Sequence, residues 1–331
     1  MPILRGDDAP AVDRAARELA AGGLVAFATE TVYGLGARAD QDSAVGGIFR
    51  AKGRPADHPL IVHVTDAQAA QAFAAEPLPD VAARLMAAFW PGPVTLVVPR
   101  RAGVAAAAAG GLPTVGLRCP DHPVARALLR RAFELGVAGV AAPSANRFGR
   151  VSPTRASHVL AEFGPELLVL DGGDCREGIE STIVDCTRDE PYLLRPGTTP
   201  RGAIEAAIGR PLRAPDAQAP RVSGSLASHY APQAEVHLVP NADLSLRVAA
   251  AARALGPATV GVYSRVAPLD AAANVRFRAM PDNARQVAHE LFAVLRQFDI
   301  DGVSQIWVEM PPEGADWDGV RDRLRRSAAS R

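Results

Sequence analysis

The stretch FRAKGRPADHPLIVHV, residues 49–64, joins the end of a helix to an apolar strand through a short, rigid loop. Gly53 and Pro55 predict that the helix ends here, because glycine favours helix termini and proline lacks the amide hydrogen that a helix needs. The apolar run 60–64 then predicts a buried strand, with His63 one residue from its end. A helix, a loop and a strand in this order are typical of an α/β fold.

The rest of the first 210 residues repeats this alternation of short apolar runs and helix-like stretches. A helix is expected over 11–21, where two glycines close it. Several connections are too short for helical crossovers, so we expect a twisted, mixed sheet with flanking helices. The expected strands are 24–28, 60–64, 94–98, 114–118, 139–142, 167–170, 182–185 and 192–194.

The composition changes after residue 210. The segment PLRAPDAQAPRVSGSLASHYAP, 211–232, is rich in Pro, Ala and Ser and has no hydrophobic periodicity, which is typical of a linker. Strand-like and helix-like stretches then alternate again up to an arginine-rich end. We therefore predict a first domain over 1–210, a linker over 211–233 and a smaller α/β, Rossmann-like domain over 234–331.

Composition excludes several classes of protein. Of the 331 residues 48% are apolar, which excludes a disordered chain, and 36 basic residues balance 36 acidic ones, so no overall field attracts nucleic acid or a membrane surface. No apolar run approaches the length of about 18 residues expected of a membrane helix, and the N-terminus lacks the apolar core of a signal peptide. Three cysteines form neither a disulfide framework nor a metal-binding pair. We expect a soluble, cytoplasmic protein with no metal site of its own.

The loop in the opening stretch carries the only lysine of the chain. Lys52, Arg54 and His58 lie around Gly53 and Pro55, while the other 35 basic residues are all arginine. Cationic groups on so restricted a loop suit the binding of a polyanion such as a triphosphate. An ordinary run of solvated charge is the alternative, and the stiffness of the loop counts against it.

A second polar cluster, TETVYGLG at 29–36, follows the first expected long strand. The residues GLGARA that begin at Gly34 fit a loose dinucleotide-binding pattern, but the preceding strand does not run directly into the glycines. We interpret the glycines as turn residues that let the backbone approach a ligand, with Thr31 directed toward it. An ordinary polar turn explains the same residues.

A third cluster, AAPSANRFGRVSP at 141–153, contains three more candidate ligands. Ser144 and Asn146 follow a strand and could contact a base or a phosphate, or form a polar turn. Ser152 before Pro153 predicts a helix N-cap, and a helix N-terminus attracts anions. Capping alone would also explain this serine.

Polar groups stand at the ends of three further strands. LPTVGLRCP contributes Thr114 and Arg118, GIESTIVD contributes Glu180 and Ser181, and LLRPG contributes Arg195. An arginine at a strand end can bind a carboxylate or a phosphate through two parallel hydrogen bonds.

Seven motifs in this order resemble those of threonylcarbamoyl-AMP synthases: TETVYGLGA, AKGRPADHPLIVH, LPTVGLRCP, APSANRFG, GIESTIVD, LLRPG and SGSLASHYAP. The resemblance extends from about residue 10 to residue 232. The chain is similar to the long form of that family, in which a YrdC-like catalytic domain precedes a smaller C-terminal domain.

The resemblance implies a cytoplasmic nucleotidyltransferase, an L-threonylcarbamoyladenylate synthase. It would join L-threonine, bicarbonate or CO2, and ATP into threonylcarbamoyl-AMP and release pyrophosphate. Magnesium would arrive with ATP rather than in a protein cage. A separate threonylcarbamoyl transferase machinery would then modify an adenosine of tRNA, so tRNA would be an indirect partner.

The same resemblance implies two groups of site residues, with Lys52 and Arg54 as the catalytic ones. The ATP site would consist of Lys52, Arg54, His58, Thr114, Ser144, Asn146, Ser152, Arg195 and Tyr230, the last closing over ATP from the linker. The threonine site would consist of Thr31, His63, Arg118, Ser181 and the backbone at Ala142.

Two other functions remain open at this stage. A non-catalytic RNA-binding module could use a concave basic face, although the neutral charge of both halves argues against it. A carbamoyl transferase with a related domain could act on another acceptor. Arg118 with Thr31 and Ser181 favours a free hydroxy amino acid, with serine in place of threonine left open.

Overall fold

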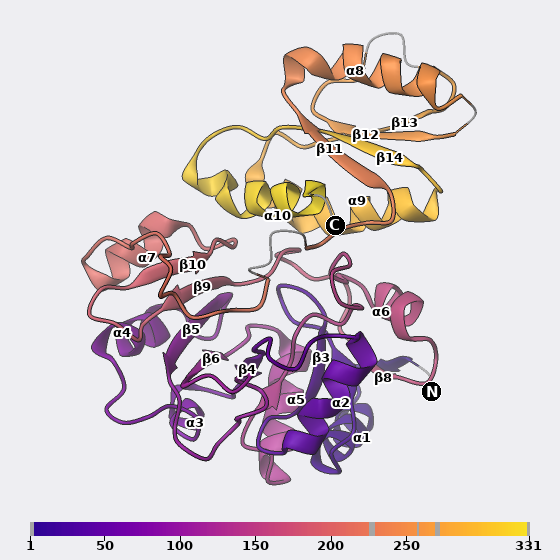
Figure 1. The fold of residues 1–331 in the computed structure, drawn as a ribbon. Helices are drawn as coiled ribbons and strands as arrows, with labels where there is room; N and C mark the ends of the chain where they lie inside the picture. The colour runs from indigo at the N-terminus through magenta and orange to yellow at the C-terminus, as the bar shows by residue number, and fades with distance from the viewer. Residues whose placement is uncertain (1–2, 225–228, 257, 269–271, 330–331) are drawn as a thin grey trace. The chain divides into compact units, whose positions relative to one another are not determined.

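The computed structural model describes residues 3–224, 229–256, 258–268 and 272–329 in two compact units (Figure 1). Unit 1 consists of Met1–Phe148 and Ser152–Ser225, and unit 2 of Gly149–Val151 and Leu226–Arg331. Three residues from the first half of the chain therefore belong to unit 2. In the described part of the chain no helix is both long and apolar enough to cross a membrane.

Unit 1 is built on a ten-stranded sheet in the order β1-β8-β2-β3-β7-β4-β6-β5-β9-β10. Parallel pairs such as β4 with β6 alternate with antiparallel pairs such as β5 with β6, so the sheet is mixed as predicted. The strands are β1 (Ile3–Arg5), β2 (Val25–Phe27), β3 (Gly34–Arg38), β4 (Ile61–His63), β5 (Val94–Pro99), β6 (Thr114–Arg118), β7 (Val140–Ala141), β8 (Leu168–Asp171), β9 (Thr182–Asp185) and β10 (Tyr192–Arg195).

Helices cover both faces of this sheet. Successive residues of a strand point to opposite faces, and in β2 Val25 and Phe27 pack on α1 and α5 while Ala26 faces the other helices. Both faces are therefore buried, which explains the short apolar runs in the sequence. The helices are α1 (Ala9–Ala20), α2 (Asp42–Lys52), α3 (Ala67–Ala70), α4 (Asp80–Phe89), α5 (Pro123–Glu134), α6 (Ala156–Phe163) and α7 (Arg201–Ile208).

The interpretation of the glycines after Tyr33 as turn residues is wrong. Gly34 and Gly36 lie inside β3, which pairs antiparallel with β2 and β7. A Cβ atom on Gly36 would lie 2.8 Å from both the Phe27 ring and a Val140 methyl group. Glycine is required here because these side chains pack against the strand, and not because the chain turns.

Unit 2 contains a parallel four-stranded sheet in the order β11-β14-β12-β13. Helix α8 lies on one side of the sheet, and α9 and α10 lie on the other (Figure 1). This is the α/β class that the sequence predicts. The elements are β11 (Glu235–Val239), α8 (Asn241–Ala254), β12 (Val260–Ser264), β13 (Val275–Ala279), α9 (Ala284–Ile300), β14 (Gln305–Glu309), η1 (Ala315–Trp317) and α10 (Asp318–Ala328).

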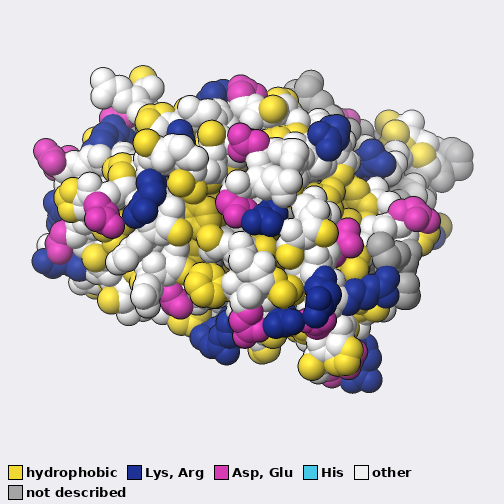
Figure 2. Space-filling view, turned by 90° about the horizontal axis from the view of Figure 1, so that it is seen from below, with side chains coloured by type: hydrophobic (Ala, Val, Ile, Leu, Met, Phe, Trp, Pro, Cys, Tyr) yellow, Lys and Arg dark blue, Asp and Glu magenta, His cyan; other side chains and the backbone are white. Residues whose placement is uncertain are grey.

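Charges of both signs are interspersed on the surface. On the face drawn in Figure 2, Asp and Glu side chains (magenta) lie among the Lys and Arg side chains (dark blue). The zero net charge of the chain thus has a local counterpart on this face.

Candidate active site

Lys52 links two of the predicted motifs. Helix α2 ends on this residue, and Gly53 caps the helix in the left-handed conformation, with φ of 63°. The side chain is only 3% exposed, and Nζ donates hydrogen bonds to the backbone oxygens of Ser144, at 2.6 Å, and Asn146. Burial, and then the charge of Arg54, lower the pKa of Lys52 well below its usual value. An anion beside this ammonium would favour its charged form.

Arg54 and His58 lie on the same loop and share an aromatic neighbour. The guanidinium carbon of Arg54 is 5.6 Å from the centre of the Phe148 ring, and the His58 ring meets Phe148 edge-on at 5.4 Å. The backbone amide of Phe148 donates to the Lys52 oxygen at 2.9 Å. The predicted cations are thus held beside residues 144–148. Partial burial, and then Arg54, lower the pKa of His58.

A second centre forms where β4, β6 and β7 run side by side. Their register places His63 next to Arg118 on one neighbour and next to Val140 on the other. Both His63 and Arg118 are buried. Desolvation, and then the charge of Arg118, lower the pKa of His63 to about 3. The imidazole is therefore neutral at physiological pH.

Arg118 is held by three oxygens. It donates to Thr31 Oγ1 at 2.9 Å and to the Gly92 oxygen at 3.3 Å, and Nη2 lies 2.7 Å from Glu30 Oε1. The hydroxyl of Thr31 lies 2.9 Å from that of Thr29. Thr31, His63 and Arg118, all predicted to bind threonine, are therefore brought together.

Ser181 and Arg195 form a third contact. Arg195 donates to the Ser181 oxygen through Nε at 3.0 Å and through Nη2 at 2.9 Å, and Nη2 also reaches Ser181 Oγ at 3.1 Å. The Ser181 hydroxyl lies 2.8 Å from that of Thr95. A residue predicted for the ATP site thus touches one predicted for the threonine site.

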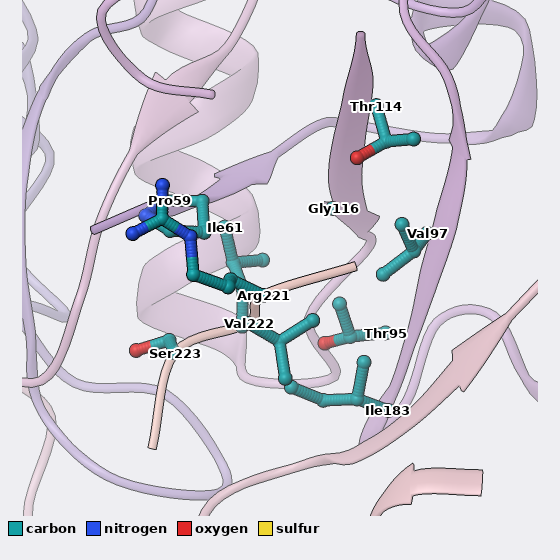
Figure 3. Close-up of a pocket in the computed structure, with 10 residues that line it drawn as sticks. All are labelled: Pro59, Ile61, Thr95, Val97, Thr114, Gly116, Ile183, Arg221, Val222 and Ser223. Atoms are coloured by element: carbon teal, nitrogen blue, oxygen red, sulfur yellow. The ribbon is translucent and has the colours of Figure 1, made fainter. Parts of the chain in front are cut away.

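Thr114 lies in a small pocket that the segment 221–223 covers. Figure 3 shows Arg221, Val222 and Ser223 on this segment, with Thr95 and Thr114 among the pocket's other side chains. The space left is about 20 Å³, enough for a single water molecule. The Ser223 oxygen accepts a hydrogen bond from Arg195 at 2.8 Å, so this segment is tied to the site.

The predicted N-cap at Ser152 is wrong. Helix α6 begins at Ala156 and its N-cap is Arg155, in an extended conformation. Ser152 lies three residues before this N-cap and so does not cap the helix; its buried hydroxyl donates to Glu180 Oε1 instead. Glu180 also acts on Lys52, whose pKa it raises.

The structure places Ala142 and Tyr230 differently from the other predicted residues. The backbone amide of Ala142 is used within the sheet, where it donates to the Ile61 oxygen at 2.9 Å. Tyr230 belongs to unit 2 and is fully buried there, with its ring stacked 5.4 Å from that of Phe292 and Arg323 5.3 Å from its centre. Its φ of 59° is unusual for a residue other than glycine.

The two predicted ligand groups leave out three polar residues that contact this site: Glu30, Thr95 and Glu180, of which Glu180 was noted only as a polar residue at a strand end. Glu30 and Glu180 lie within quoted motifs, and the signal was an acidic residue in an otherwise apolar, strand-rich context. Within the described ranges, no three or more His, Cys, Asp or Glu side chains are grouped so as to hold a metal ion.

Comparison with known protein families covers nearly the whole chain. The Sua5/YciO/YrdC family model, described as "Telomere recombination", matches residues 17–197. The model described as "Threonylcarbamoyl-AMP synthase, C-terminal domain" matches residues 199–329.

Individual relatives also match nearly the whole chain. The threonylcarbamoyl-AMP synthase of Pyrococcus abyssi is 39% identical over 94% of this chain and 92% of its own length. That of Bacillus subtilis is 37% identical over 97% of this chain and 94% of its own length. The crystal structure of P. abyssi Sua5 complexed with L-threonine matches with a TM-score of 0.87 at 38% identity, over 97% of this chain and 95% of that one. With two family models and these full-length relatives in agreement, the chain belongs to the threonylcarbamoyl-AMP synthase family.

Proposed function

We propose that the protein condenses L-threonine, bicarbonate or CO2, and ATP into threonylcarbamoyl-AMP and pyrophosphate. The observation that carries this proposal is the buried Lys52 ammonium on the carbonyls of Ser144 and Asn146, in the same unit as the Arg118–Thr31 centre. Lys52 supplies positive charge for a polyanion. The Arg118–Thr31 centre supplies an arginine and a hydroxyl for a small amino acid.

The nucleotide would bind at the Lys52 end. Lys52 and Arg54 would face the phosphates, with Arg195 as a third countercharge. Because burial has already removed water from Lys52, its attraction to a phosphate oxygen is stronger than at the surface. Ser144, Asn146, Ser152, His58 and Thr114 would complete the ATP site.

Threonine would bind at the Arg118 end. Arg118 would hold the carboxylate, and Thr31, His63 and Ser181 would contact the hydroxyl or the amine. A neutral His63 suits this task, because it adds no charge beside the amine. A site built around the hydroxyl penalises analogues that lack it.

The reaction requires the bound groups to be aligned. The ammonium group of threonine first loses a proton, and the free amine then forms a carbamate, either by adding to CO2 with loss of a second proton or by reacting with bicarbonate with loss of water. A carbamate oxygen then attacks the α-phosphorus while pyrophosphate leaves. The protein's contribution is to gather several anions without mutual repulsion and to hold them in line. Mg²⁺ bound to ATP would neutralise phosphate charge. The described residues offer it no cage of three acidic, His or Cys ligands, so we assign it no protein ligand.

The linker would act on the bound nucleotide. Tyr230 and the segment 211–233, of which residues 225–228 lie outside the described ranges, would close over bound ATP and exclude water from the adenylate. Limited proteolysis tests this: cleavage within 211–233 should slow when ATP and threonine are both present, and equal rates would contradict it.

The adenylate would pass to a separate transferase machinery that modifies tRNA.

The direct test is product formation. The purified protein is incubated with ATP, bicarbonate and either threonine, serine or alanine, and pyrophosphate and the adenylate are measured. We expect pyrophosphate release that requires all three substrates, greatest with threonine and least with alanine. Salt-sensitive tRNA binding without ATP consumption would instead support the RNA-binding alternative.

A further inference from the structure

Glu30 is a fully buried carboxylate that lacks hydrogen bonds. Its Oε1 lies 2.7 Å from Arg118 Nη2, but without the alignment of a hydrogen bond, and neither oxygen accepts one from any described residue. The backbone holds the residue in place, since its carbonyl accepts from the Glu177 amide at 2.7 Å. Buried carboxylates are normally hydrogen-bonded, so this one has acceptor capacity that only a ligand or a water molecule can use.

The charge of the pair indicates which ligand would fit. Arg118 and Glu30 together are neutral, and Arg118 already has hydrogen bonds to Thr31 and Gly92. A ligand with only a carboxylate would add a second negative charge beside Glu30. A zwitterion presents a carboxylate to Arg118 and an ammonium group to Glu30, so the complex stays neutral.

We propose that Glu30 binds the α-ammonium group of threonine and thereby restricts the site to zwitterionic amino acids. This inference rests on the proposed function and deepens it. Ser181, Thr31 and the neutral His63 can donate to or accept from the ligand, but none of them carries the negative charge that an ammonium group seeks in a dry site. Glu30 therefore acts in specificity as the charge partner of Arg118.

Calorimetry with two ligands tests this assignment. L-threonine is compared with 3-hydroxybutanoate, which keeps the carboxylate and the hydroxyl but has no ammonium group, on the wild-type protein and on Glu30→Gln. We expect the wild type to prefer threonine by about 100-fold. In Glu30→Gln threonine affinity should fall by about 30-fold or more, while 3-hydroxybutanoate binds as well as before or better, because the repelling charge is gone.

Two outcomes would overturn the assignment. If both ligands lose affinity by the same factor in Glu30→Gln, Glu30 only orients Arg118. If the wild type binds the two ligands equally, no group in the site recognises the ammonium. Glu190→Gln is the matched control, because Glu190 is an exposed carboxylate paired with Arg213, and it should change neither affinity.

A second variant keeps the test decisive if Glu30→Gln does not fold. Glu30→Asp keeps the negative charge near Arg118, so it should still prefer threonine by more than about tenfold. Loss of that preference in a folded Glu30→Asp protein also counts against the assignment. Failure of the wild type to form the adenylate would refute the proposed function instead, and the two failures are therefore distinguishable.

Discussion

Lys52 and Arg118, two of the buried cations of unit 1, are held in opposite ways. Lys52 donates to two backbone carbonyls, and burial, followed by the charge of Arg54, lowers its pKa. Arg118 faces the carboxylate of Glu30 at 2.7 Å. A cation held by neutral carbonyl groups is suited to a polyanion, and a cation beside a carboxylate is suited to a ligand that carries both charges. One sheet thus presents two kinds of electrostatic site, which matches the chemistry of joining a nucleotide to an amino acid.

The largest effect is expected from Lys52→Arg. The net charge is kept, but a planar guanidinium cannot take the position of a compact ammonium between the carbonyls of Ser144 and Asn146. We expect kcat for adenylate formation to fall by about 100-fold or more. Arg50→Lys, on an exposed residue in the last turn of the same helix, is the control and should remain active. Near-normal turnover of Lys52→Arg would show that the Lys52 site needs only a positive charge.

A smaller and more selective effect is expected from Arg118→Lys. The lysine keeps a charge opposite Glu30 but cannot also reach Thr31 and Gly92, so KM for threonine should rise by about 30-fold. KM for ATP should stay within about twofold. Steady-state kinetics with each substrate varied in turn checks this, and an equal rise in both constants would remove the distinction between the two centres. Arg84→Lys, in an exposed ion pair, is the control.

The pKa of His63 gives a prediction for stability against pH. The folded protein holds this pKa at about 3, below the usual value near 6.5, so between these values the unfolded chain binds a proton that the folded one does not. Stability therefore falls as pH is lowered. At pH 5 the loss attributable to His63 is about 2 kcal/mol relative to pH 7.

Urea unfolding of the wild type and His63→Gln at pH 7 and pH 5 measures this difference. The variant should lose less stability on acidification than the wild type does. Substitution of His289, an exposed histidine, should leave the wild-type dependence unchanged. A pH dependence that His63→Gln does not alter would show that His63 is not held neutral by burial.

The smallest effect is expected at the covering segment of the Thr114 pocket. Arg221 pairs with Asp57 at 2.7 Å, but both side chains are more than half exposed. Arg221→Ala should reduce the free energy of unfolding by less than about 1 kcal/mol. Denaturant titration checks this, and a larger loss would mean that the segment is held mainly by charge rather than by Val222 and its apolar neighbours.

Local sequence patterns were sufficient for most of the fold of unit 1. Each of the eight expected strands is present, because short apolar runs between polar segments are what a sheet covered on both faces requires. The residues of strand β3 were interpreted as a turn, because the reason for glycine at position 36 lies in the packing of Phe27 and Val140, which are distant in the sequence. The edge strand β1 was not expected, since its three residues are too short to show a pattern.

Contacts between residues that are distant in the sequence also limited what could be predicted of the site. Polar residues at strand ends led to the prediction of Thr31, His63 and Arg118 as ligands, and the structure brings these three residues together, while their role stays a prediction. Glu30 could not be assigned a task, because its charge partner is 88 positions further along the chain. Ser152 was taken for a cap because Pro153 follows it, but the helix begins only at Ala156, and the Ser152 hydroxyl donates to Glu180, which is distant in the sequence.

The short piece Gly149–Val151 limits how this protein can be dissected. Within unit 2, the Gly149 oxygen accepts from the Ala231 amide at 3.0 Å, and the Val151 oxygen accepts from Arg296. No single cut separates the two units: a cut near residue 225 leaves residues 149–151 of unit 2 on the amino-terminal fragment, and a cut before residue 149 divides unit 1 itself. To shorten the enzyme, it is therefore not enough to end the chain before the linker. The segment Gly149–Val151 would also have to be redesigned.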